Sequence, residues 1–226
     1  MRDRIVDELG DLAHSRFLVY LMGPYEAFDI EAVLEAGDAD AALDLSEIPE
    51  SVDFGTLVGS EADLDRQEAV FDLLLFVRDR LRTDPGVNAF LAVDVDVPLE
   101  EVDAGTQSVE FALASNAVIY VVPKLGDNLG VGIEAGSVLE ALYRERTASE
   151  DEDGDDPAVG SHHERVAFVH ESGVRSAMIA AVQDRWDARV YSYADREDLV
   201  RQVRLFVRDL ARREQRGDLP TLDSDQ

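Results

Sequence analysis

Short apolar runs alternate with helix-forming segments along most of this chain, and this alternation limits the possible folds more than any other feature. The clearest run is 117–122, Ala-Val-Ile-Tyr-Val-Val, which is rich in β-branched residues and typical of a buried parallel strand. Other runs predict strands at 17–22, 89–93, 166–170 and 188–192. Helices are predicted at 62–83, 106–115, 173–183 and 195–214, and another is predicted to begin after Gly130 and Gly132 and to run to about Arg146. We therefore expect an α/β fold, a three-layer α/β/α sandwich around a five-stranded, parallel, doubly wound sheet of flavodoxin or Rossmann type.

The pattern predicts a single α/β domain over residues 1–216. A length of 226 residues fits one domain, or one domain with an appendage. Residues 27–60 have weak periodicity and scattered acidic residues and glycines, so we interpret them as a loop-rich insertion with a short helix near 30–36. The run 149–160 is acidic and predicts a solvated surface loop, and 217–226 predicts a flexible acidic tail.

The charge balance indicates the solvent in which the chain works. There are 49 acidic against 21 basic residues, the net charge is −28, and the only lysine is Lys124. This composition is typical of a protein in concentrated salt, where the Debye length falls to about 3 Å and self-repulsion is screened. We therefore expect a halophile's cytoplasmic protein. The alternative, that the carboxylates bind metal ions or a basic partner, remains open.

Several classes of function are disfavoured by composition. A field this negative repels nucleic-acid backbones and anionic membrane surfaces, so we expect neither as a partner. No stretch approaches the roughly 20 apolar residues of a membrane span, and the first residues do not resemble a signal peptide. The chain has no cysteine, which excludes disulfides, cysteine metal sites and a thiol nucleophile. The acidic run 150–156 fails the calcium-loop pattern. His162-His163 beside Glu164 are a candidate metal site, but adjacent histidines on a loop are more often solvated, and His14 and His170 have no companions at ligand spacing. We therefore expect no metal and no cofactor.

Two segments lie where a doubly wound sheet binds its ligands. In such sheets the ligand sits beyond the carboxyl ends of the strands, at the point where the strand order reverses. The first segment, 20–25, reads Tyr-Leu-Met-Gly-Pro-Tyr and ends the first predicted strand. The second, 128–136, reads Asn-Leu-Gly-Val-Gly-Ile-Glu-Ala-Gly, follows the strand at 117–122 and opens a helix.

Together the two segments resemble the nucleoside 2-deoxyribosyltransferase-like superfamily. Its first strand ends in a Tyr-Leu-x-Gly-Pro type turn, and its later loop reads Asp-x-Gly-x-Gly-x-Glu-x-Gly. The resemblance covers the core from about 17 to 145 in the order of its elements. The chain also looks like an uncharacterised protein family of haloarchaea, which implies no known activity.

The resemblance implies that Glu134 is a catalytic nucleophile that attacks the anomeric carbon of a nucleoside. A carboxylate in the first turn of a helix is kept ionised by the unpaired backbone N–H groups and the positive end of the helix dipole. Tyr20 matches the tyrosine that positions this carboxylate. The other substrate-binding residues that the resemblance implies are Gly23, Pro24, Tyr25, Asn128, Gly130 and Gly132.

The chain departs from the superfamily pattern at two positions. The loop aspartate that contacts the sugar falls on Asn128, with Asp127 one residue out of register. The aspartate that protonates the leaving base falls near Ser108, and the nearest carboxylate is Glu110. Asp94, after the second strand, is another auxiliary carboxylate. Loss of a general acid typically lowers the rate 10²–10⁴-fold.

We therefore expect an enzyme that hydrolyses or transfers the N-glycosidic bond of a nucleoside or nucleotide through a glutamate nucleophile. The alternative is a non-catalytic nucleotide-binding or scaffold domain with a degenerate active site. A third hypothesis is a domain that cleaves NAD or binds a dinucleotide, because Gly130-x-Gly132-x-x-Ala135 fits a relaxed dinucleotide fingerprint. The resemblance is compatible with a homo-oligomer, since members of the superfamily commonly associate.

Overall fold

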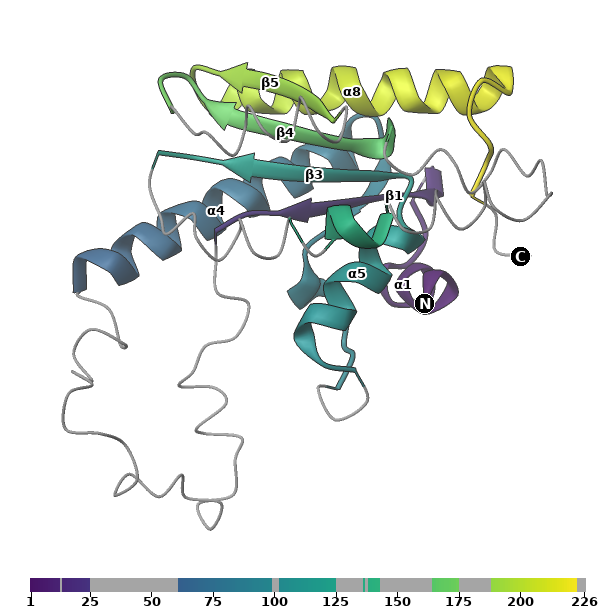
Figure 1. The fold of residues 1–226 in the computed structure, drawn as a ribbon, viewed down its shortest axis with the longest axis horizontal. Helices are drawn as coiled ribbons and strands as arrows, with labels where there is room; N and C mark the ends of the chain where they lie inside the picture. Colours follow the sequence, from purple (N-terminus) through teal and green to yellow (C-terminus); the bar gives the residue numbers. More distant parts are fainter. Residues whose placement is uncertain are drawn as a thin grey trace, which may run out of the picture.

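Five parallel strands in the order β2-β1-β3-β4-β5 form the sheet at the centre of the protein (Figure 1). The strands are β1 (His14–Met22), β2 (Val87–Phe90), β3 (Ala117–Val122), β4 (Val166–Glu171) and β5 (Arg189–Tyr193). The structure is a computed structural model that describes residues 1–12, 14–24, 61–98, 102–124, 136, 138–142, 164–174 and 188–222. The strand order is that of flavodoxin-like proteins, so the expected doubly wound α/β fold is confirmed.

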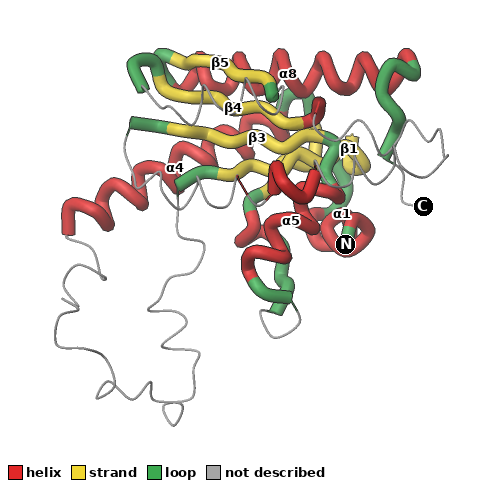
Figure 2. The backbone as a smooth tube through the Cα atoms, viewed as in Figure 1, coloured by secondary structure: helices red, strands yellow, loops and turns green. Residues whose placement is uncertain are grey.

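Helices cover both faces of the sheet (Figure 2). The bounds are α1 (Arg2–Leu9), α4 (Glu61–Thr83), the short 3₁₀ helix η2 (Ala92–Asp94), α5 (Ala104–Ala114) and α8 (Arg196–Arg216), and residues 138–142 are also helical. Helices α4 and α8 pack on one face, while α1, α5 and the helical residues 138–142 pack on the other. The expected three layers are therefore present.

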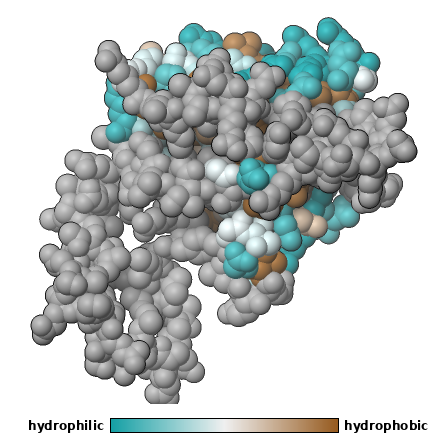
Figure 3. Space-filling model, in the orientation of Figure 1, coloured by the Kyte–Doolittle hydropathy of each residue, from teal (hydrophilic) through white to brown (hydrophobic). Residues whose placement is uncertain are grey.

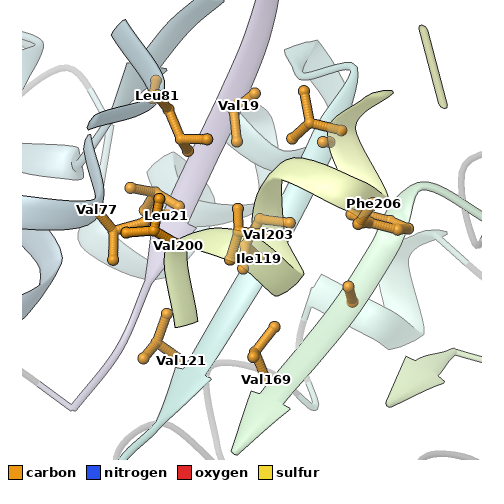
Figure 4. Packing of buried hydrophobic residues seen from close by; sticks show 14 of the residues in the cluster. Val19, Leu21, Val77, Leu81, Ile119, Val121, Val169, Val200, Val203 and Phe206 are labelled. Carbon is orange, nitrogen blue, oxygen red and sulfur yellow. The ribbon is translucent and has the colours of Figure 1, made fainter. Parts of the chain in front are cut away.

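The alternation of side chains along the strands divides the core into two. On β1, Val19 and Leu21 point into the core beneath α4 and α8, where Figure 4 shows Val19 beside Leu81 and Leu21 beside Val77. Tyr20, between them, points into the core beneath α5. Every residue of β3 is buried, as expected of a central parallel strand covered on both faces.

Capping side chains mark the starts of α5 and α8, and a glycine ends α8. The Asp103 carboxylate caps α5 by accepting a hydrogen bond from the Thr106 backbone N–H at 3.1 Å, and the hydrogen bonds from Thr106 lower the pKa of Asp103. Asp195 caps α8 in the same way. Gly217 ends α8 in the left-handed conformation, with φ 75°, which glycine adopts at little cost.

Two expectations at element ends differ from the structure, and one helix was not predicted. Residues 2–9 form α1, a segment for which no element was predicted. The strand predicted at 89–93 ends at Phe90, because the Asp94 carboxylate accepts the Leu91 backbone N–H at 2.9 Å and closes η2. The flexible tail predicted from 217 is wrong for its first residues, since Leu219 is 2% exposed and packs in the core under α8.

Other expectations fall wholly or partly outside the described residues. The insertion at 27–60, with its short helix, and the acidic loop at 149–160 lie outside them. Of the helix predicted at 173–183, residues 173 and 174 form part of a turn and the rest lies outside.

Hydrophilic side chains dominate the described surface over α8, at the top of the view in Figure 3. The large hydrophobic residues most exposed in the described ranges are Met1, Val93 and Leu205. None of the helices within those ranges combines the length and the apolar character that crossing a membrane would require.

Candidate functional site

The sheet reverses its strand order between β1 and β3, which are neighbours although β2 lies between them in the chain. The chain leaves β1 through Gly23 and Pro24 and leaves β3 through Pro123 and Lys124. Parallel strands bring these exits to the same edge of the sheet, where doubly wound proteins bind their ligands. We call this the carboxyl edge.

Gly23 and Pro24 are both buried at the carboxyl edge. A Cβ atom on Gly23 would lie 2.9 Å from Cδ1 of Leu74, a residue of α4 that is 0% exposed. Glycine is therefore needed here so that α4 can approach the end of β1.

Gly23→Ala is expected to lower the free energy of unfolding by about 1–3 kcal/mol, because the added methyl group overpacks the contact with Leu74. Chemical denaturation at constant salt measures this loss. Gly136→Ala is the matched control, since a Cβ there meets nothing within 4 Å. Alanine destabilises a helix less than glycine does, so Gly136→Ala should raise the free energy of unfolding by about 0.5–1 kcal/mol. Equal stability of Gly23→Ala and the wild type would show that the contact does not constrain position 23.

Tyr20 lies at the same end of β1, on the face covered by α5. It is 1% exposed, stacked on Phe90 with ring centroids 5.1 Å apart and edge-on to Phe111 at 5.6 Å. The Tyr20 hydroxyl lies 3.5 Å from Oγ of Ser108 on α5. The two neighbouring rings fix the orientation of the Tyr20 side chain. Its hydroxyl lies next to Ser108, the position at which the resemblance would place a proton donor.

The Asp94 carboxylate belongs to the opposite side of the sheet from Tyr20. Its Oδ1 accepts a hydrogen bond from Arg78 at 2.5 Å, and Arg82 lies 3.5 Å from its Oδ2. Both arginines are on α4, which covers the face that Tyr20 does not enter. These contacts give Asp94 a structural role, joining the end of β2 to α4.

Glu110 lies on α5 two residues after Ser108, which places the two side chains about 200° apart around the helix. Ser108 is buried, whereas Glu110 is half-buried. Among the described residues, neither Glu110 nor Asp94 forms a hydrogen bond with Tyr20. The remaining candidates Tyr25, Asp127, Asn128, Gly130, Gly132 and Glu134 lie outside the described residues.

A second polar cluster, not expected from the sequence patterns, lies at the carboxyl edge of β3, β4 and β5. The carboxylate of Glu171, the last residue of β4, accepts the backbone N–H of Lys124 at 3.0 Å and lies 3.3 Å from its Nζ. His170 precedes Glu171, and its Nδ1 lies 3.1 Å from the Glu171 carbonyl oxygen. The sequence did contain a signal, since His170 ends the strand predicted at 166–170, Glu171 follows it, and Lys124 is the only lysine.

Tyr193, the register partner of Glu171 on β5, carries a buried hydroxyl with no hydrogen-bond partner in the structure described. Burial, and then the negative charge of Glu171, raise the pKa of the Tyr193 phenol well above its usual range. The Tyr193 phenol is therefore harder to ionise than an exposed tyrosine.

Tyr193→Phe is expected to raise the free energy of unfolding by about 1 kcal/mol, because it removes a buried hydroxyl that satisfies no hydrogen bond. Thermal and chemical denaturation at constant salt give the change. Tyr20→Phe is the comparison, since that hydroxyl has a neighbour in Ser108 and its loss should bring no such gain. A clear loss of stability in Tyr193→Phe would mean that its hydroxyl is satisfied.

Within the residues that the structure describes, no group of three His, Asp or Glu side chains is placed to hold a metal ion. The chemistry available at the described part of the edge is that of a tyrosine and a serine hydroxyl, an ammonium, an imidazole and a carboxylate.

The fold and this edge define a doubly wound α/β protein with polar groups gathered at the edge of the sheet where proteins of this fold class bind ligands. The chain belongs to the family described as a domain of unknown function, DUF7509, which it matches over residues 2–223. No curated protein and no solved structure matches it.

Proposed function

We propose that this protein cleaves the N-glycosidic bond of a nucleoside or nucleotide at the carboxyl edge, between β1 and β3, with Glu134 as the nucleophile. Both hydrolysis and transfer to a second base follow from such a nucleophile. Tyr20 orients the carboxylate, and Gly130 and Gly132 let the sugar approach the backbone.

One observation carries the proposal. The segment that contains Glu134 starts after Lys124, at the carboxyl end of β3, and leads to the helical residues 138–142. Val138 and Leu139 pack in the same core as Tyr20, on the face covered by α5. The described residues on either side of the segment therefore lie at the carboxyl edge and on the face where Tyr20 and Ser108 meet, as expected if Tyr20 positions the Glu134 carboxylate.

The chemistry has two steps. The Glu134 carboxylate attacks the anomeric carbon, the carbon–nitrogen bond breaks, and its electron pair leaves with the base. Water then attacks the glycosyl ester, which gives the free sugar and restores the carboxylate. Ser108 is too weak an acid to replace a carboxylic acid, so the base takes its proton from solvent and turnover is slower by the 10²–10⁴-fold that a general acid supplies.

The environment of Ser108 favours a second candidate function, a non-catalytic nucleotide-binding domain. The position at which the resemblance places an aspartate proton donor holds Ser108, whose Oγ lies 3.5 Å from the Tyr20 hydroxyl, and Asp94 is held in ion pairs with α4. Such a domain would bind the same ligands without releasing base. A domain that cleaves NAD is a third candidate, so a dinucleotide belongs in the test.

We also infer that the protein works in the concentrated salt of a halophilic archaeon's cytoplasm, as a homo-oligomer like members of the superfamily it resembles. The net charge of −28 and the ratio of acidic to basic residues support the salt requirement. Base release is expected to rise as KCl increases from about 0.1 M to about 3 M, because salt screens the self-repulsion.

The test is a panel of nucleosides, nucleoside 5′-monophosphates and NAD, incubated with the protein in high salt and analysed for free base by chromatography. The expected result is release from at least one member by the wild type and none above background by Glu134→Ala. No release from any member, or equal release by the variant, would contradict the proposal. Binding without release would support the second candidate.

A further inference from the structure

Helix α8 carries a stripe of charged residues with one leucine at its centre, on the side that faces away from the sheet. Figure 1 shows α8 beside β5, along one side of the molecule. Leu205, near the middle of the helix, is 56% exposed. Four charged residues lie within about 40° of Leu205 around the helix axis: Asp198, Arg201, Asp209 and Arg212. The stripe is therefore a candidate contact surface.

The charges of α8 have opposite signs on the two sides of Leu205. Arg201 lies four residues before Leu205, and Asp209 lies four residues after it. Asp198 and Arg212 lie seven residues before and after it. Two further pairs, eight and nine residues away, follow the same rule: Glu197 with Arg213, and Arg196 with Glu214. Wherever both members of such a pair are charged, their charges are opposite.

This pattern makes α8 complementary to an antiparallel copy of itself. In a pair of chains related by a two-fold axis at Leu205, residues equally far from Leu205 in opposite directions face each other across the axis. Arg201 of each copy then faces Asp209 of the other, and Asp198 faces Arg212. In a parallel pair in register, each charge would face its own kind. The charges therefore favour one direction and one register.

The charged residues of the stripe can each take a further partner. Arg201 donates to Asp198 at 2.5 Å, yet the Arg201 side chain is 68% exposed. Asp209 accepts from Arg189 at 2.7 Å and is 46% exposed. In the part of the chain that the structure describes, Arg212 forms no ion pair. Since a guanidinium has several donors and a carboxylate several acceptor positions, contacts between copies need not break those within one.

We propose that two copies of this chain associate through α8 as an antiparallel pair, with Leu205 at the two-fold axis. The two Leu205 side chains cover each other at the axis, and the ion pairs on either side set the register. The inference gives the homo-oligomer inferred above a surface and a symmetry, and it is independent of the proposed reaction.

The net charge of −28 is compatible with this contact. α8 carries seven arginines and four acidic residues, so the contacting helix is not part of the acidic excess. In concentrated salt the Debye length falls to about 3 Å, so repulsion between the two chains is screened while side chains in contact still interact. The dimer is therefore expected to weaken as KCl is lowered.

Light scattering at about 3 M KCl, over a series of protein concentrations, tests the surface. The wild type is expected to reach twice the monomer mass of 24.9 kDa. Leu205→Asp should raise the Kd of the dimer at least about tenfold, because each copy loses an apolar contact and places a carboxylate at the axis. Val93→Asp is the matched control, since Val93 is 50% exposed and lies in η2. It should leave the Kd within about twofold.

Cysteine cross-linking tests the direction of the helices, because the chain has no cysteine of its own. Leu205→Cys is expected to form a disulfide between copies under mild oxidation. A mixture of Arg201→Cys and Asp209→Cys should give at least about fivefold more cross-linked dimer than either variant alone, since like positions would lie about 12 Å apart along the axes. Glu68→Cys, at an exposed position of α4, is the control and should not cross-link.

The outcomes separate this surface from the other proposals. A wild type that stays monomeric at every concentration would contradict both the surface and the homo-oligomer. A dimer that resists Leu205→Asp would overturn the surface alone, and so would Arg201→Cys cross-linking by itself as fast as the mixture. Base release is measured separately, so the dimer and the proposed reaction can each fail without the other.

Discussion

Glu134→Gln is expected to lower base release at least about a thousandfold while changing nucleotide affinity less than about threefold. Glutamine keeps the shape of the side chain and its hydrogen-bonding oxygen but cannot form the glycosyl ester. Removal of a nucleophile acts on the transition state, so kcat falls and KM changes little. Steady-state rates by chromatography and calorimetric binding constants give the two quantities.

The control for this prediction is Glu68→Gln, the same substitution at an exposed residue of α4. It should leave both quantities within about twofold of the wild type, since surface substitutions away from special contacts have small effects. If both variants lost activity equally, the loss would reflect a general response to removing a negative charge and would not identify Glu134 as the nucleophile. A Glu134→Gln variant with wild-type turnover would remove Glu134 from the reaction.

Glu214→Ala is expected to lower the free energy of unfolding by about 3–5 kcal/mol, the largest effect on stability that the structure indicates. Arg165 is 1% exposed and its Nη1 donates to Glu214 at 2.5 Å. The same carboxylate accepts the Asn116 side-chain amide at 2.9 Å, and Arg165 also donates to the carbonyl oxygen of Pro220 at 2.5 Å. Alanine at 214 would leave the guanidinium buried without its counter-charge.

Glu197→Ala is the matched control for Glu214→Ala because both residues are on α8. Glu197 pairs with Arg80 at 2.9 Å, but the two side chains are 59% and 46% exposed. Exposed pairs contribute about 0–1 kcal/mol, so this variant should be nearly as stable as the wild type. Denaturant titrations of the two variants at one salt concentration test the contrast. If Glu214→Ala lowered the free energy of unfolding no more than Glu197→Ala, the stabilising role of the buried Arg165–Glu214 pair would be contradicted.

The central elements of the fold could be predicted because their sequence signals are local and strong. The run 117–122 is apolar throughout and became β3 with the same bounds, and the periodicity at 62–83 became α4. The ends of elements were less predictable because tertiary contacts set them. The helix η2 depends on a hydrogen bond from the Leu91 backbone N–H to the Asp94 carboxylate. The burial of Leu219 depends on its packing in the core that α8 covers.

The candidate site could be predicted only in part, because only some of its residues belong to a local sequence motif. Motif spacing led to Tyr20, and the structure adds that its hydroxyl meets Ser108 across 88 positions of the chain. Lys124 and Glu171 are 47 positions apart and form no motif, so only the pairing of β3 with β4 brings them together. Residues directly after predicted parallel strands are therefore candidates even where no motif marks them.

The most direct test of the central claim is mass spectrometry of the protein quenched during turnover of its fastest substrate. Proteolysis then locates any glycosyl group on the chain. The account predicts one deoxyribosyl or ribosyl group, with its phosphate if the substrate is a nucleotide, on the peptide that carries Glu134, and its absence in Glu134→Gln. Base release with the sugar on another carboxylate, such as Asp127, or with no adduct at any quench time, would contradict it.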